Sequence, residues 1–207
     1  MIRPVLALAA IAFLLAGCSA LPDKPVRATL YDFGPGTMAS ATTGQLPPLV
    51  LADVDVSGGL EGTAMHYRLG YVDAQQLRPY AQARWSAPPP QLVRQRLRQV
   101  LNRERAVLDP GDSAGLARSG GAAPRVLRVD LEEFSHLFES TTDSSGLVRL
   151  RATLMENTIG GEKLLSQRSF VVRKPAATPD APGGARALAA AVDAAAGEIA
   201  QWLAQQR

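Results

Sequence analysis

The chain has 207 residues, a formal net charge of +3 at pH 7 and a single cysteine, Cys18. One cysteine cannot form an internal disulfide, a Cys-x-x-Cys redox pair or a thiolate zinc site, so these classes are excluded. The excess of positive charge is small and gives no indication of a nucleic-acid-binding protein.

Residues 1–17 have the composition of a secretory signal peptide, with a positive charge at Arg3, an apolar run over 5–15 and small residues before Cys18. A spanning helix needs about 20 apolar residues, so this run is too short to cross a membrane. The segment Leu15-Ala16-Gly17-Cys18 resembles the bacterial lipobox, in which the cysteine is acylated and becomes the first mature residue. We therefore expect a diacylglycerol and an N-acyl chain on Cys18, a stable anchor, and no other cofactor.

The residue after the cysteine indicates the destination. Similarity to bacterial lipoproteins implies that Ser19 permits transfer to the outer membrane, so we expect a protein on the periplasmic face of that membrane. Residues 18–26, with two prolines, are predicted to be the acylated N-terminus and tether. The eight residues after the cysteine span at most roughly 27 Å, at about 3.3 Å per residue. Residues 27–207 are predicted to form one domain.

The first half of this domain contains three predicted strands and a helix. Aromatic and β-favouring residues predict a strand over 27–33, and alternating apolar residues predict strands over 49–56 and 65–71. A polar turn is expected at 73–78. Three prolines at 88–90 favour the start of a helix. Its predicted apolar stripe contains Leu92, Val93, Leu97, Val100 and Leu101.

The second half is predicted to contain an antiparallel meander and a final helix. After a Gly- and Ala-rich loop over 108–124, three strand-like runs are joined by turns at 139–146 and 157–162. The runs cover residues 126–134, 147–155 and 164–173. On the first two, the carboxylates of Asp130 and Glu132 are expected beside Arg149 and Arg151.

A linker over 174–184 is predicted to lead to an amphipathic helix over 185–205. Its expected buried face contains Leu188, Val192, Ala195, Ile199, Trp202 and Leu203. The predicted fold class is α/β (α+β), a single domain with a mostly antiparallel or mixed sheet covered by two main helices.

Catalytic motifs are absent from the sequence: it contains no nucleophile elbow, phosphate-binding loop, His-Glu-x-x-His pair or Ca²⁺ loop. His66 and His136 have no companion at metal-ligand spacing, so we interpret both as solvated or hydrogen-bonded. We expect neither a metal site nor an enzyme.

A cluster of aromatic residues and arginines is the most distinctive feature of the domain, because these residue types anchor protein interfaces. The predicted partner-binding residues are Tyr67, Arg68, Tyr80, Arg84 and Trp85. A strand that lines the core explains Tyr67 and Tyr71 equally well. Trp85, just before the prolines, is expected to lie outside the core.

An ordered set of segments connects the chain with a known family. After the lipobox it includes Tyr31-Asp32, Tyr67-Arg68-Leu69, Tyr80, Arg84-Trp85-Ser86-Ala87-Pro88, residues 127–134 and Arg168-Ser169-Phe170. Over most of its mature length the chain thus resembles the ABC-type transport auxiliary lipoproteins, the PqiC-like components of MCE lipid transport systems.

This resemblance implies a non-catalytic auxiliary component that works with an ABC ATPase, a permease and an MCE-domain protein anchored in the inner membrane. It also implies docking at the outer membrane and a homo-oligomer. The alternative is a lipoprotein that itself binds a lipid or lipopolysaccharide as an assembly factor, which requires an apolar cavity of a few hundred Å³. A surface hydrolase is a third and weaker hypothesis.

Overall fold

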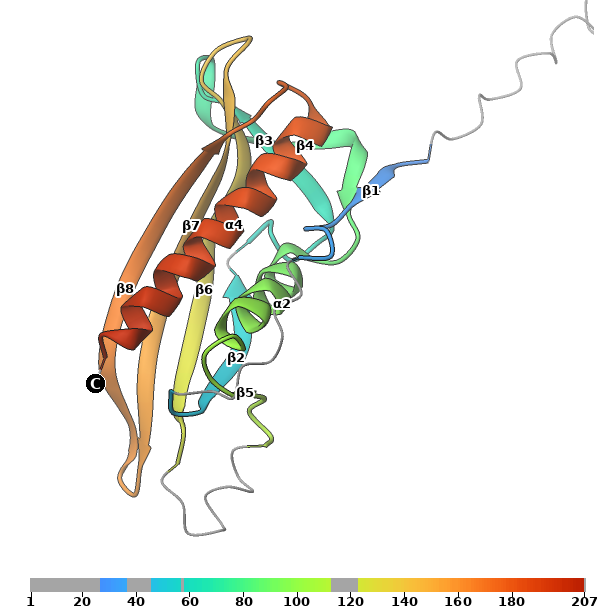
Figure 1. The fold of residues 1–207 in the computed structure, drawn as a ribbon. Coiled ribbons are helices and arrows are strands. Elements are labelled where there is room, and N and C mark those ends of the chain that lie inside the picture. Colours follow the sequence, from blue (N-terminus) through green and yellow to red (C-terminus); the bar gives the residue numbers. More distant parts are fainter. Residues whose placement is uncertain (1–26, 37–45, 57, 113–122, 207) are drawn as a thin grey trace, which may run out of the picture.

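The computed structural model describes residues 27–36, 46–56, 58–112 and 123–206. The predicted signal peptide, Cys18 and the tether lie outside the described residues. Three long antiparallel strands form the centre of the fold: β6 (Arg125–Phe138), β7 (Ser144–Thr158) and β8 (Gly161–Pro175). They curve together along the long axis of the molecule (Figure 1). The predicted meander is confirmed, with longer strands and shorter turns.

The remaining strands lie beyond the other edge of β6. β2 (Leu49–Val56) pairs in parallel with the first half of β6, and β3 (Ala64–Leu69) pairs in parallel with its last residues. β4 (Asp73–Trp85) is antiparallel to β3 and parallel to β1 (Thr29–Tyr31), while β5 (Val107–Leu108) pairs with β2. Within the described residues the strands form one mixed sheet of eight strands, as the predicted fold class allowed.

One sequence prediction in this region is wrong. The expected turn over 73–78 is the first half of β4, because the chain reverses earlier, at Gly70, where Val72 N donates to Leu69 O at 2.9 Å. Gly70 fits there because a Cβ would lie 3.0 Å from the Leu137 side chain. The polar residues after the turn obscured the strand, since one of its faces is exposed to solvent.

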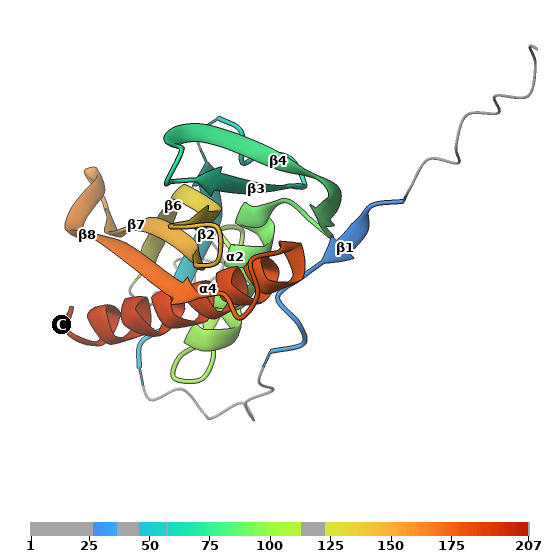
Figure 2. The ribbon, with the colours of Figure 1, turned by 90° about the horizontal axis from the view of Figure 1, so that it is seen from above.

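Both helices pack on one face of the sheet. α2 (Pro89–Leu101) contacts β2, and α4 (Ala181–Ala204) crosses β6, β7 and β8 and contacts α2 (Figures 1 and 2). The predicted linker over 174–184 is too long, because β8 continues to Pro175 and α4 begins at Ala181. The carboxylate of Asp180 caps the helix by accepting from Gly183 N at 2.8 Å.

The core lies between this helical layer and the sheet. The predicted face of α4 is confirmed, since its six residues are all at most 4% exposed. The α2 stripe is confirmed at four positions, whereas Val100 is half-buried. No helix of the described segments is long and apolar enough to cross a membrane.

The predicted charge pairing on the outer face of the sheet is confirmed for Arg151. Its guanidinium lies 3.2 Å from Asp130 and 3.3 Å from Glu132. Arg149 instead stands opposite Glu133, because the register between β6 and β7 shifts by one residue after Leu131.

Candidate functional site

The predicted partner-binding residues lie on the β3–β4 hairpin. Tyr67 and Arg68 belong to β3, and Tyr80, Arg84 and Trp85 belong to β4. Pairing of the strands brings the Tyr67 and Tyr80 rings to a centroid distance of 4.7 Å. The structure thus joins the two tyrosines into one contact.

Trp85 lies in the core, so the expectation that it lies outside is wrong. Its side chain is 1% exposed and packs between Phe33 and Phe134, with centroid distances of 5.6 and 5.3 Å. Trp85 ends a strand in which Ala83 faces the same core, and this strand was not predicted. A direct contact between the indole and a partner is therefore not supported.

Both arginines of the cluster are committed to internal contacts. Arg68 donates to both carboxylate oxygens of Glu133, at 3.1 and 3.0 Å, and this pair is largely buried. It also donates to the carbonyls of Ala74 and Gln75, at 3.2 Å each. Arg84 donates to backbone carbonyls of its own strand. Arg68 therefore ties the hairpin to β6 and holds it in one position.

His136 forms the buried polar centre beneath the tyrosines. It is 0% exposed, and the Tyr80 hydroxyl lies 2.8 Å from its Nδ1. Burial lowers the pKa of His136 to about 4, against the smaller opposing effects of Asp180 and Glu139. Burial also raises the pKa of Tyr80 far above its usual value. At neutral pH both groups are uncharged, so their contact is a structural hydrogen bond.

His66 lies in a different environment from His136, half-buried on β3. Burial is the main cause that lowers its pKa, followed by the positive charges of Arg68 and Arg84. These charges also oppose the binding of a cation. Across the described ranges, no group of histidine, aspartate, glutamate or cysteine residues could hold a metal ion.

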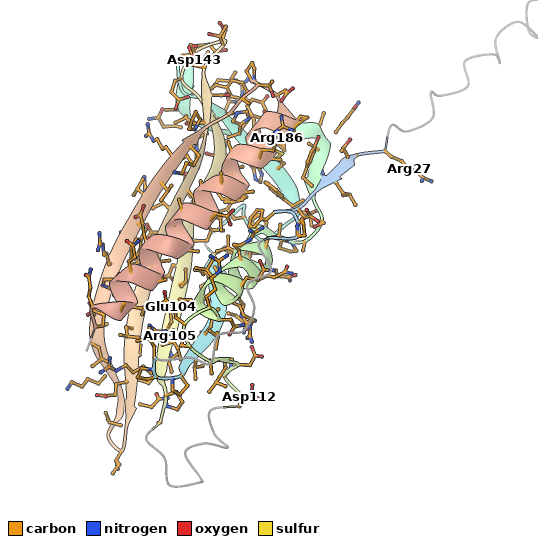
Figure 3. All side chains as sticks on the ribbon, viewed as in Figure 1. Arg27, Glu104, Arg105, Asp112, Asp143 and Arg186 are labelled. Carbon is orange, nitrogen blue, oxygen red and sulfur yellow. The ribbon has the colours of Figure 1, made fainter. Side chains whose placement is uncertain are left out.

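The turn of the hairpin exposes two large apolar side chains. Tyr71 and Val72 are 47% and 64% exposed, beyond the Tyr67–Tyr80 contact. We call Tyr67, Arg68, Tyr71, Val72 and Tyr80 the hairpin surface. Sequence reasoning missed Val72, although an apolar pair directly after Gly70 was an available signal. Figure 3 labels Asp143 at the same end of the molecule, in the turn between β6 and β7.

The sequence profile of the ABC-type transport auxiliary lipoprotein component matches residues 29–200, which contain every described strand and nearly all of α4. The chain belongs to this family. The ABC-type transport auxiliary lipoproteins are accessory components of ABC-type transport systems, and this chain shares that general function. The family resemblance inferred from the sequence is confirmed. Among curated proteins the chain has no match.

Solved structures with the same fold include protein XCC0632 from Xanthomonas campestris, described as a DUF330 protein. It has a TM-score of 0.68 and 17% identity over 85% of this chain and 94% of that chain. The hypothetical protein CT253 from Chlamydia trachomatis has a TM-score of 0.51 and 10% identity over 80% of this chain and 98% of that chain. At these identities the likeness shows the fold alone.

Proposed function

We propose that this auxiliary lipoprotein is anchored in the outer membrane and docks an MCE-domain protein of an ABC lipid transporter, without catalysing a reaction. The observation that carries the proposal is the family match over residues 29–200. The MCE partner and the outer membrane are inferences from the sequence resemblance and from Ser19.

The position of the domain start is compatible with a short lipid tether. Arg27 lies at the outer end of β1, away from the hairpin turn and from the turn between β7 and β8 (Figures 1 and 3). A tether of roughly 27 Å from Cys18 would therefore hold the domain near the bilayer through β1. In this arrangement the hairpin surface stays free to meet a partner.

The hairpin surface is the proposed docking element. Tyr71 and Val72 supply exposed aromatic and aliphatic area, which favours partner contact. The Arg68–Glu133 pair and the Tyr67–Tyr80 contact hold this area in place before binding, which reduces the entropy lost on association.

The docking proposal predicts that Tyr71→Ser with Val72→Ser weakens partner capture at least about tenfold, because anchor truncation costs 2 kcal/mol or more. The measurement is recovery of the MCE-domain protein from detergent-solubilised envelopes with the full lipoprotein as bait. Val171→Ser is the matched control, since Val171 is 56% exposed on β8. Recovery of no MCE-domain protein by the wild-type chain would contradict the proposed partner.

The anchoring proposal predicts that the Cys18→Ser variant folds normally and is no longer attached to the membrane. The described elements all lie C-terminal to the tether, so the circular dichroism spectrum and melting midpoint of the variant should match those of wild type. Fractionation of the envelope should move the variant from the outer membrane to the soluble periplasm. Retention in the outer-membrane fraction would contradict the lipid anchor.

A homo-oligomer is part of the same proposal. Native mass spectrometry of the lipoprotein released from detergent should give a multiple of the protomer mass, and a monomer at micromolar concentration would count against self-association.

A further inference from the structure

A second feature lies at the end of the molecule opposite the hairpin surface. There a cavity of about 750 Å³ opens between the start of β2, the start of β6, the end of β7 and the C-terminal end of α4. Its apolar walls include Leu46, Leu49, Leu154 and Leu203, and Arg105 and Arg125 also line it. We call it the Arg105 cavity. Figure 3 labels Arg105 at this end.

Arg105 is a charged residue that is largely buried in the wall of this cavity. The residue is 8% exposed, and burial lowers the pKa of its guanidinium, against a smaller opposing effect of Glu104. Within the described part of the chain, its side chain forms no ion pair and donates no hydrogen bond. A guanidinium carries five N–H donors, and the nitrogens of Arg105 are not among the fully buried side-chain atoms that lack a partner, so these donors are accessible from solvent. The cavity that it lines is where a partner for these donors can bind.

The other charged side chains that the structure describes in the cavity wall do not pair with Arg105. Arg125 Nη1 donates to the carbonyl of Gln206 at 2.6 Å, so Arg125 caps the C-terminal end of α4. Glu156 also lines the cavity but is not within ion-pair distance of either arginine. Among the described residues that line the cavity, two are cations and one is an anion, and Arg105 is the cation whose donors have no partner.

The apolar walls of the cavity indicate that the ligand also has an apolar part. Leu49, Leu154 and Leu203 belong to the core and are at most 4% exposed, and the half-buried Leu46 lines the cavity with them and with Arg105. A volume near 750 Å³ suits one ligand of moderate size. An aliphatic chain would contact the leucines while an anionic head accepts hydrogen bonds from Arg105.

We propose that the Arg105 cavity binds a single-chain anionic amphiphile, with its carboxylate or phosphate on Arg105 and its chain against the leucines. This inference goes beyond the docking function and does not depend on it. Such binding would support the alternative hypothesis from the sequence analysis, in which the lipoprotein itself binds a lipid.

The test is calorimetric titration of a soluble form, Ser19–Arg207, which keeps every described strand and helix. Oleate and lysophosphatidylglycerol, each below its critical micelle concentration, test the carboxylate and phosphate sources of the head. Oleyl alcohol has the chain without the charge, and acetate and inorganic phosphate have the charge without the chain. We expect saturable binding of at least one of the two amphiphiles, and at least about tenfold weaker binding of the three controls.

Two variants test the site itself. Arg105→Met should weaken amphiphile binding at least about tenfold, because it removes the donors that hold the anionic head. Ala204→Trp, at an exposed wall position, should block the cavity without touching Arg105. Arg173→Met removes an exposed arginine of β8 and is the matched control, with binding unchanged.

Three results would overturn the proposal: no saturable binding of either amphiphile, equal binding of oleyl alcohol, or unchanged binding by both cavity variants. None of these results bears on capture of the MCE-domain protein, so failure of this inference and failure of the docking proposal can be told apart.

Discussion

At the residue scale, His136 contacts both Tyr80 of β4 and Gly184 at the start of α4. A Cβ on Gly184 would lie 2.4 Å from His136 Nδ1, the atom that meets the Tyr80 hydroxyl. Only a glycine at this helix position leaves room for the buried imidazole. The hydrogen bond joins β4 to β6, and the first turn of α4 packs directly against the imidazole.

Burial of His136 predicts that stability falls on mild acidification. Its pKa is lowered from 6.5 to about 4, so between these values the unfolded chain binds more protons than the folded chain. Stability from this group is therefore fully present above about pH 6.5 and is lost as the pH falls toward 4. From pH 7.5 to 5.0 the free energy of unfolding should fall by about 2 kcal/mol.

Urea unfolding at the two pH values measures this loss, and His136→Gln is the matched variant. The variant should be less stable at pH 7.5 and should show a smaller difference between the two pH values. The lowered pKa of His66 leaves a remaining dependence of the same sign. An equal difference in wild type and variant would show that His136 does not cause the loss.

At the element scale, α4 depends on small residues to approach the sheet. Ala191, Ala195 and Ala196 are 0% exposed, and a Cβ on Gly146 of β7 would lie 2.5 Å from the backbone of α4 at Leu188. The helix backbone therefore packs directly against β7. Alanine favours the helix and also sets this short distance between the layers.

This close approach predicts that added volume on the buried face of α4 is costly. Ala195→Leu should lower the free energy of unfolding by about 1–3 kcal/mol, because the core has no space for three more carbons. Ala190→Leu makes the same change on the exposed face and should be close to neutral. Chemical denaturation of both variants gives the comparison, and equal effects would contradict the packing argument.

At the scale of the whole molecule, the hairpin surface and the Arg105 cavity occupy opposite ends of the long sheet (Figure 1). β6 and β7 run between them. The two sites share no residues, so their binding energies should be independent.

If the two sites are independent, a variant of one site should not change binding at the other. Tyr71→Ser with Val72→Ser should leave oleate binding unchanged, and Arg105→Met should leave recovery of the MCE-domain protein unchanged. Calorimetry and pull-down with the same four proteins, including the double-site combination, check both statements. A loss of both activities from changes at one end would reveal coupling along the sheet.

The sequence by itself determined the features that depend on local patterns. Alternation over the meander and the 3.6-residue stripes of both helices predicted the elements, because backbone geometry decides which side chains share a face. The ordered segments also predicted the family correctly. The lipobox at Cys18 is likewise a local signal, and it stays a prediction because it lies outside the described residues.

Only the tertiary structure decided which of the singled-out side chains are exposed. Trp85 is buried because β1 and β6 bring Phe33 and Phe134 against it, and Arg68 is engaged because Glu133 stands 65 residues away on the neighbouring strand. The Arg105 cavity forms where segments far apart in the chain meet. Burial and charge pairing result from such contacts between distant segments, and a local sequence pattern does not encode them.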